Sequence, residues 1–422
     1  MARFVVMTGS EDGHFYPCVP IIRKLVQRGN EVIWYTGRKY EEKIRAIGAG
    51  FHPLPVKTDS SSTDMYIFHP GLKELTGLAQ TKYYLKHIFL DACEPEMEEL
   101  ENIIADFKPD VLIGDTITFS IYFESELSGI PGAMISLLPL ALPGKDVAPF
   151  GLGLTPGTNF MTKTKTRSLN FFVNQILLRD ITLYANSTRQ KLGLNRLQGP
   201  FFPAMFKIPS LILHISTPAF EYPRKNLPGN VQFIGPVLKE KDLAYHPPAW
   251  WEDLNRIDPV ILVNQGTIAM DLNDLVIPTI QGLQNERMWV VAVPVKPGQI
   301  KSIPANLRAE PFIPFEHLLP HVDIMVTNGG YGGVQMALAH GVPLVVAGNT
   351  DDKMEVAARV EWSKTGINLK KQRPSSDEIR NAVNEVLRNP VYRENAKRVQ
   401  ADFARYDAPE QAANLLEGLV KM

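Results

Sequence analysis

Short apolar runs alternate with helix-forming segments along most of this chain, and few folds accommodate such a pattern. Apolar runs of this length, bounded by turns and rich in Val, Ile and Leu, are typical of parallel strands buried on both faces. In the first half we expect strands at residues 4–7, 31–36, 110–115, 132–136 and 209–215, and helices at 20–28, 94–107 and 119–128. A strand, a helix and a second parallel strand predict a right-handed crossover and a doubly wound sheet.

The same alternation starts again after residues 216–250, a segment that contains six prolines and is typical of a linker. Beyond it we expect strands at 259–264, 288–293, 323–327 and 343–347, and helices at 275–283, 333–340 and 355–362. Because a single core rarely grows beyond about 250–300 residues, a chain of 422 residues predicts two domains. The predicted fold class is therefore α/β, with two Rossmann-like doubly wound domains that face a cleft.

We place the first domain at residues 1–215, the linker at 216–250 and the second domain at 251–400. Residues 401–422 predict a C-terminal helix, which we expect to pack back on the first domain. Residues 136–160 interrupt the alternation of the first domain with four prolines. A loop of this length in a compact domain is usually functional or mobile.

The composition excludes several classes of protein. Lys plus Arg number 44 and Asp plus Glu number 45, whereas a nucleic-acid-binding protein usually has a basic surplus. The two cysteines, Cys18 and Cys93, cannot form a disulfide framework, which indicates a reducing compartment. No apolar run reaches the ~18 residues of a membrane span, and the N-terminal run is too short for a signal peptide. We therefore expect a cytoplasmic protein, monomer or homodimer, with no membrane segment and no nucleic-acid partner.

A histidine, His14, follows the first predicted strand in a Gly-His-x-x-Pro segment, residues 13–17. Ligands of open parallel sheets bind beyond the carboxyl ends of the strands, and the ordinary pKa of histidine suits a general base. Asp115 stands at the carboxyl end of another predicted strand, where a carboxylate can orient an imidazole. Taken alone, a loop histidine is more often solvated or bonded to the backbone, and Asp115 is equally typical of a helix N-cap.

A glycine-rich segment, residues 326–334, lies between a predicted strand and a predicted helix and has four glycines in five residues. Glycines let backbone N–H groups approach a phosphate, and a helix N-terminus adds partial positive charge. We interpret the segment as an anion site rather than a tight turn; it is not a Walker motif, since no Gly-Lys-Ser/Thr follows. Gly266 and Thr267 offer a further amide and hydroxyl after a predicted strand, although a short turn explains them as well.

Two acidic residues, Asp351 and Asp352, follow the last predicted strand. They can accept hydrogen bonds from sugar hydroxyls, and a role as N-cap residues of the helix at 355–362 explains them about as well. A Gly-x-Gly segment at 151–153 follows no strand, so we discount it as an anion site. Metal ligation has little support, because no Asp-x-Asp sequence occurs anywhere in the chain.

In this order, the motifs resemble those of inverting family 1 glycosyltransferases, whose two Rossmann-like domains form the GT-B fold. The resemblance covers nearly the whole chain and is strongest between residues 312 and 352. The family's Gly-His-x-x-Pro loop matches residues 13–17, which implies that His14 is the catalytic base and Asp115 its partner. The implied nucleotide-sugar site comprises Gly266, Thr267, Phe312, Ile313, Asn328, Gly330, Gly332, Gly333, Asp351 and Asp352.

The resemblance also implies roles within the nucleotide-sugar site. Phe312 stacks on the nucleotide base, where relatives usually have Trp, and the backbone of Ile313 bonds the base edge. Residues 328–333 and Thr267 stabilise the diphosphate, so that no metal is required. Asp352 holds sugar hydroxyls. The donor substrate is then a nucleotide-diphosphate sugar, and no prosthetic group is implied.

Three positions depart from the family pattern. Asn328 replaces a His that contacts phosphate, Met336 replaces a Glu that takes both ribose hydroxyls, and Lys353 replaces a Gln. An Asn amide still donates a hydrogen bond, but a thioether cannot replace a bidentate acceptor. Losing the ribose acceptor is less costly if the donor carries deoxyribose, so a dTDP-sugar stands beside a UDP-sugar as the expected donor.

The resemblance implies inverting transfer of a hexosyl group, of glucose or rhamnose type, from a UDP- or dTDP-sugar to a hydroxyl group. The acceptor walls that we expect are Met65, Tyr66, Phe68 and the apolar loop 137–160. Such walls favour a lipophilic small molecule such as a flavonoid, a phenolic or a polyketide. Packing between the two domains explains the same residues equally well.

Two other functions stay open from the sequence. A nucleotide-sugar epimerase on the same fold would turn over donor without an acceptor. A catalytically silent relative would bind and activate a partner transferase; Asn328 and Met336 favour this function, whereas His14 and Asp115 count against it. A NAD-dependent oxidoreductase is disfavoured, because the glycine-rich segment lies in the second half and lacks Gly-x-Gly-x-x-Gly spacing.

Overall fold

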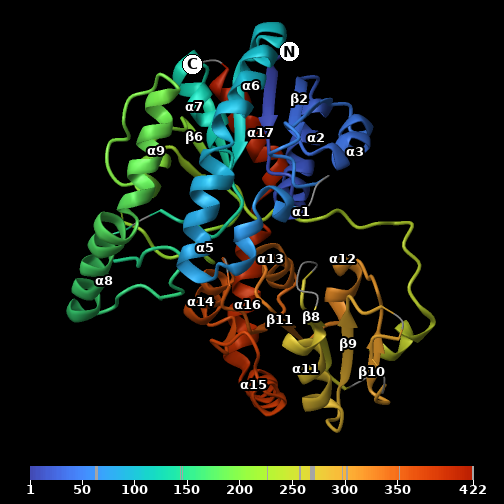
Figure 1. Ribbon diagram of the computed structural model, residues 1–422. Helices are drawn as coiled ribbons and strands as arrows, with labels where there is room; N and C mark the ends of the chain where they lie inside the picture. The colour runs from blue at the N-terminus through green and yellow to red at the C-terminus, as the bar shows by residue number, and fades with distance from the viewer. Residues whose placement is uncertain are drawn as a thin grey trace.

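Two parallel β-sheets, one in each half of the chain, form the framework of the protein (Figure 1). The computed structural model describes residues 1–61, 65–142, 144, 146–225, 227–255, 258–266, 271–296, 298–300, 303–350 and 352–420. Helices cover both faces of each sheet, which confirms the predicted α/β class and its two doubly wound sheets. Within the described ranges, no helix combines the length and the apolar character that crossing a bilayer requires.

The first sheet has seven strands in the order β3-β2-β1-β4-β5-β6-β7, and every neighbouring pair is parallel. Its strands are β1 (Arg3–Met7), β2 (Glu31–Thr36), β3 (Gly50–Pro53), β4 (Val111–Asp115), β5 (Gly132–Ser136), β6 (Leu211–His214) and β7 (Val231–Phe233). The strand order reverses between β1 and β4, so the carboxyl ends of these two strands flank the place where such sheets bind ligands.

Ten helices of the described chain belong to the first half. They are α1 (Asp12–Phe15), α2 (Val19–Gln27), α3 (Glu41–Ala46), α4 (Met65–Phe68), α5 (Gly77–Tyr83), α6 (Cys93–Phe107), α7 (Phe119–Ser128), α8 (Phe160–Phe172), α9 (Arg179–Lys191) and α10 (Phe201–Met205). Successive side chains of a strand point to opposite faces of the sheet. Phe4 and Val6 therefore pack with α2, whereas Val5 and Met7 pack with α6 and α7.

The second sheet has six parallel strands in the order β10-β9-β8-β11-β12-β13. Its strands are β8 (Val260–Asn264), β9 (Trp289–Val293), β10 (Leu307–Ala309), β11 (Ile324–Thr327), β12 (Leu344–Val346) and β13 (Gly366–Asn368). The helices that follow in the chain are α11 (Val276–Leu283), α12 (Phe315–Leu318), α13 (Tyr331–Ala339), α14 (Lys353–Ser363), α15 (Ser376–Arg388), α16 (Pro390–Phe403) and α17 (Ala408–Leu419).

Four short strands, β3, β7, β10 and β13, are absent from the sequence prediction. β7 lies inside residues 216–250, which we expected to be a linker, and pairs with β6 in the first sheet. A strand of three residues is too short to show a periodic pattern, so its pairing is set by tertiary contacts.

The last helix, α17, packs against α2 of the first half (Figure 1). The Arg28 guanidinium binds the carboxylates of Glu410 and Glu417, and the Asn30 side chain donates to Glu417 at 2.7 Å. Residues 401–403, which we had grouped with the last helix, belong instead to the end of α16. The C-terminal end of the chain thus connects the two halves.

Candidate active site

His14 lies on α1, the single helical turn that follows β1 closely, and its ring points to the end of β4. Its Nδ1 atom is 2.9 Å from Oδ2 of Asp115, the last residue of β4. Because β1 and β4 are adjacent and parallel, their carboxyl ends lie side by side and bring the two residues together. The His14 side chain keeps 17% of its surface exposed, whereas the Asp115 side chain is fully buried.

Backbone groups fix the Asp115 carboxylate. Its Oδ2 atom accepts the Gly9 N–H at 2.9 Å, and its Oδ1 atom accepts the Ile117 N–H at 2.9 Å. A carboxylate held in this way accepts a hydrogen bond from the Nδ1–H of His14, which leaves Nε2 as the basic nitrogen of the neutral ring. This arrangement is that of an oriented general base.

The charges around His14 raise its pKa. Burial alone would lower the pKa, but the charge and hydrogen bond of Asp115 outweigh burial and, with Glu11 and Asp352, raise it to about 9. Asp352 belongs to the second half of the chain, so its influence shows that it lies within electrostatic reach of the imidazole. A charge of the second half thus acts on His14.

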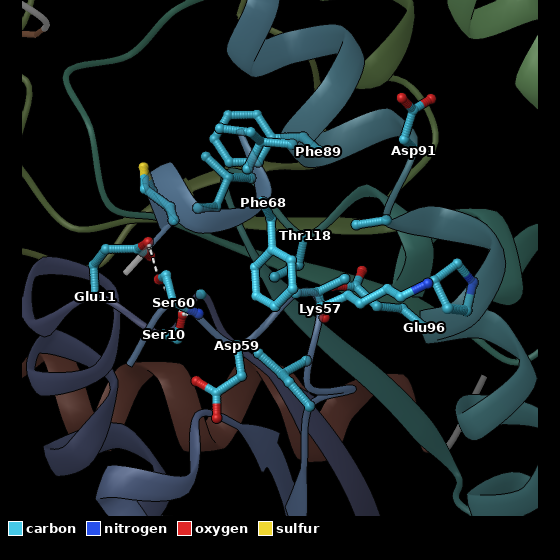
Figure 2. Close-up of a pocket in the computed structure, with 18 of the residues that line it drawn as sticks. Ser10, Glu11, Lys57, Asp59, Ser60, Phe68, Phe89, Asp91, Glu96 and Thr118 are labelled. Atoms are coloured by element: carbon cyan, nitrogen blue, oxygen red, sulfur yellow. Dashed lines mark hydrogen bonds between the residues drawn. The ribbon is translucent and has the colours of Figure 1, made fainter. Parts of the chain in front are cut away.

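A cavity of about 450 Å³ opens beside the His14 loop in the first half (Figure 2). Gly9 and Ser10 line it, and so does Thr118, the N-cap residue of α7. Its apolar walls include Met7, Leu54, Met65, Phe68, Phe89 and Ile117. Charged side chains line it as well, among them Glu11, Lys57, Asp59, Asp91 and Glu96. A concave cavity of this size is typical of a small-molecule site.

Two of the residues expected to form acceptor walls, Met65 and Phe68, line this cavity. Tyr66 is not among the described lining residues; its ring faces the Lys73 ammonium, 5.0 Å from the ring centre. The described part of loop 137–160 does not line the cavity either. That loop contacts the second half instead, as described below.

The glycine-rich segment lies between β11 and α13, as expected. Gly329 has a φ of +87°, a conformation that favours glycine, and Gly330 is the N-cap residue of α13. Gly332 and Gly333 lie in the first turn of this helix. The backbone N–H groups of a first turn have no acceptor within their own helix. Nothing lies within 4 Å of the place that a Cβ atom of Gly332 would occupy. The N-terminus of α13 is therefore open to an anion.

The Asn328 side chain is buried and donates through Nδ2 to the carbonyl oxygen of Gln265. This bond joins the loops that follow β8 and β11 and uses one of the two N–H donors of the amide, so donation to the diphosphate stays a prediction. Gly266 lies against the same amide, since a Cβ there would be 3.5 Å from Nδ2. Two further predicted residues, Thr267 and Asp351, lie outside the described residues.

Phe312 and Ile313 follow β10 and differ sharply in exposure. The Phe312 side chain is 66% exposed, which leaves its ring open to a stacking partner, whereas Ile313 is buried. Asp352 occupies the N-cap position of α14 but makes no capping hydrogen bond there. Helix capping therefore does not explain its presence.

A buried ionic network between the two halves escaped the sequence analysis. The Arg359 guanidinium of α14 binds Glu221 at 2.9 Å and Glu355 at 3.1 Å, and all three side chains are at most 5% exposed. Oε1 of Glu355 also accepts three backbone N–H groups, from residues 151, 152 and 153, at 2.9, 3.1 and 2.9 Å. The Gly-x-Gly segment that we discounted thus does hold an anion, the chain's own carboxylate.

Comparison with known proteins bears on this site. The family described as "Erythromycin biosynthesis protein CIII-like, C-terminal domain" matches residues 284–419. The chain is 40% identical to 4'-demethylrebeccamycin synthase of Lentzea aerocolonigenes, over 99% of this chain and 100% of that protein. It is 30% identical to UDP-glycosyltransferase 2 of Phaeomoniella chlamydospora, over 94% of this chain and 90% of that protein. The chain belongs to the family 1 glycosyltransferases.

Solved structures agree with this membership at the level of the fold. The glycosyltransferase of kitacinnamycin superimposes with a TM-score of 0.73 at 18% identity, over 99% of each chain. The calicheamicin glycosyltransferase CalG4 gives a TM-score of 0.73 at 20% identity, over 100% of this chain and 98% of that one. This glycosyltransferase therefore has the GT-B fold that the resemblance implied, and it is an enzyme.

Proposed function

We propose that this glycosyltransferase moves a hexosyl group from a UDP- or dTDP-sugar to a hydroxyl group of a flat, lipophilic small molecule, with inversion at the anomeric carbon. The observation that carries the proposal is the position of His14. Asp115 holds its ring through a hydrogen bond. The residues just before it in the sequence, 9–11, line the cavity of the first half. The charge of Asp352, in the second half, contributes to its raised pKa. A base at this place can take a proton from an acceptor hydroxyl while a sugar is held opposite.

In the proposed reaction, Nε2 of His14 removes the proton as the acceptor oxygen attacks the anomeric carbon. The bond from that carbon to the diphosphate oxygen breaks in the same step, and its electron pair leaves with the nucleotide. The N-terminus of α13, with Gly330, Gly332 and Gly333, stabilises the negative charge that develops on the diphosphate. Phe312 stacks on the base and Asp352 binds sugar hydroxyls.

The names of relatives support one donor nucleotide, and a residue of this chain supports the other. UDP-glycosyltransferase 2 and the UDP-glucosyltransferase B1 of Starmerella bombicola, 31% identical, favour a UDP-sugar. Met336, in place of a ribose-binding Glu, favours a dTDP-sugar. On the acceptor side, the name 4'-demethylrebeccamycin synthase and the apolar walls of the cavity favour a lipophilic natural product.

The test is direct. The purified protein is incubated with UDP-glucose, dTDP-glucose or dTDP-rhamnose and a panel of flavonoids and other phenols, and glycosides are detected by mass spectrometry. We expect transfer with one nucleotide, a product of inverted anomeric configuration by NMR, and equal rates with EDTA or Mg²⁺. Isomerisation of donor without acceptor would instead indicate an epimerase, and no turnover without an added transferase would indicate a silent partner.

A further inference from the structure

One buried carboxyl group in the acceptor cavity has no part in the mechanism above. Glu96 lies on α6 and lines the same cavity as Phe68, Phe89 and Thr118 (Figure 2). Its side chain is only 8% exposed. A carboxyl group in such a place costs free energy unless hydrogen bonds compensate it, so its presence calls for a reason.

The protein satisfies this carboxyl group only in part. Oε2 of Glu96 accepts the Ser120 hydroxyl at 2.8 Å, and the hydroxyl of Thr58 also bonds the group. A carboxylate has about four acceptor positions, so two hydroxyls leave some of them for another donor. Besides burial, three residues influence its pKa: Ser120, Thr58 and Asp115. None of these residues is a cation.

Burial raises the pKa of Glu96 to about 7, against the hydrogen bonds of Ser120 and Thr58. Near neutral pH the group is therefore present both as a carboxylate and as an acid. Either form accepts a hydrogen bond from an N–H or O–H group, and an apolar group in the same place would leave a buried polar atom unpaired.

The position of Glu96 relative to His14 fixes which part of an acceptor it meets. Asp115, the partner of His14, also raises the pKa of Glu96, so the two carboxyl groups lie in one neighbourhood. Gly9 and Ile117, whose N–H groups bind Asp115, line the cavity together with Glu96. An acceptor bound in this cavity would therefore contact both Glu96 and residues 9–11, the segment that leads to His14.

We propose that Glu96 is a specificity-determining residue that selects acceptors with an N–H or O–H donor on the part inserted into the cavity. The inference rests on the proposed function, because it assigns this cavity to the acceptor. It narrows the acceptor class from lipophilic phenols in general to flat aromatic molecules with a second hydrogen-bond donor. An acceptor whose second donor is methylated loses this hydrogen bond and leaves Glu96 unpaired.

The test uses two isoflavones, daidzein and its methyl ether formononetin, which differ only in the methylation of one phenolic O–H. Dissociation constants are measured by calorimetry for the wild type, Glu96→Met and Ser120→Ala. We expect the wild type to bind daidzein about tenfold more tightly than formononetin, as the loss of a hydrogen bond to a buried charged group predicts. In Glu96→Met this preference disappears, because the thioether accepts no strong hydrogen bond.

Ser120→Ala is the matched control. It removes the hydrogen bond between Ser120 and Glu96 but no described lining residue of the cavity. If Glu96 served only to hold α7, Ser120→Ala would mimic Glu96→Met; we expect it to keep the preference for daidzein. Should Glu96→Met fail to fold, Glu96→Gln replaces it, and the preference then falls severalfold because the amide carries no charge.

Three results would overturn the inference: equal binding of both isoflavones by the wild type, binding of neither, or an unchanged preference in the Glu96 variants. These failures are separate from a failure of the proposed function. If glycosides of other phenols form with a nucleotide sugar while the isoflavone preference is absent, only the role of Glu96 is wrong. If no phenol of the panel is glycosylated, the proposed function fails first.

Discussion

At the scale of single residues, His14 is the group whose removal most directly tests the chemistry. We expect His14→Ala to lower kcat by about 10²–10⁴, the usual contribution of general base catalysis. The affinity for UDP or dTDP should change little, because the diphosphate is proposed to bind at α13. Rates are measured by product formation at saturating donor, and nucleotide affinity by calorimetry.

His52→Ala is the control for this prediction. His52 also lies beside a carboxylate, that of Glu99 at 3.2 Å, but it belongs to β3, the edge strand that lies two strands away from β1. Its replacement should leave kcat within about twofold, as expected for a surface substitution of small energetic effect. Near-full activity of His14→Ala toward a hydroxyl acceptor would remove His14 from the mechanism.

The raised pKa of His14 predicts the pH dependence of the reaction. The neutral imidazole is the base, and in the free enzyme its pKa is raised from 6.5 to about 9. The value of kcat/KM, which reports the free enzyme, should therefore rise with pH until about 9 and then level off. In Asp115→Asn the carboxylate charge is lost, so the apparent pKa should fall even though the rate drops. A profile that is flat between 6.5 and 9 would contradict this prediction.

The sequence predicts some of these residues well and others not at all. His14 and Asp115 each follow or end a strand, so the rules of parallel sheets place them at one edge. The contact between Glu355 and the loop at 151–153 cannot be predicted in this way, because the Gly151 N–H and the carboxylate are 204 residues apart in the sequence. Glu96 lies in an ordinary amphipathic helix, and only the cavity beside it distinguishes it from a surface glutamate.

At the scale of elements, the first turn of α13 offers a test in which stability and binding change in opposite directions. Gly332→Ala should stabilise the protein by about 0.5–1 kcal/mol, because glycine is a poor helix former and the added methyl group meets nothing within 4 Å. The same methyl group narrows the approach of a diphosphate to the helix N-terminus. We expect the dissociation constant for UDP or dTDP to rise roughly tenfold, about the loss of one hydrogen bond to a charged group.

Gly418→Ala is the matched control for Gly332→Ala. Gly418 lies in α17, and its added Cβ would also meet nothing within 4 Å. This variant should gain stability by a similar amount and bind nucleotide as the wild type does. Thermal unfolding and calorimetric titration measure both quantities, and equal nucleotide affinity in the two variants would argue against a diphosphate site at α13.

The sequence predicts those elements whose local pattern of apolar residues agrees with their burial in the fold. β4 and β5 each have five buried residues, most of them apolar, and they form where the sequence predicts them. β3 and β13 each begin with a glycine and contain few β-branched residues, so their propensity is weak. They become strands because a neighbouring strand, β2 or β12, supplies the hydrogen-bond partners.

At the scale of the whole molecule, the ionic network around Arg359 joins the parts that we propose to hold the two substrates. Glu221 precedes β7 of the first sheet. Its Oε1 atom accepts the Leu140 N–H at 3.1 Å and the Tyr331 hydroxyl at 3.4 Å. Tyr331 begins α13, and Glu355 holds the loop at 151–153. The charge of Arg359, together with His214, lowers the pKa of Glu221 despite its burial. The carboxylate therefore stabilises the fold above its ordinary pKa of 4.5, and this stabilisation is lost as the pH falls below it.

Replacing Arg359 by Met measures how strongly this network holds the halves together. The side chain keeps its bulk, but Glu221 and Glu355 lose their buried counter-charge, which costs about 3–5 kcal/mol of unfolding free energy. Arg405→Met, at an exposed pair with Asp402 on a side chain that is 79% exposed, is the control and should cost about 0–1 kcal/mol. Thermal unfolding compares the two variants. Equal stability of both variants would mean that packing, not charge, joins the halves.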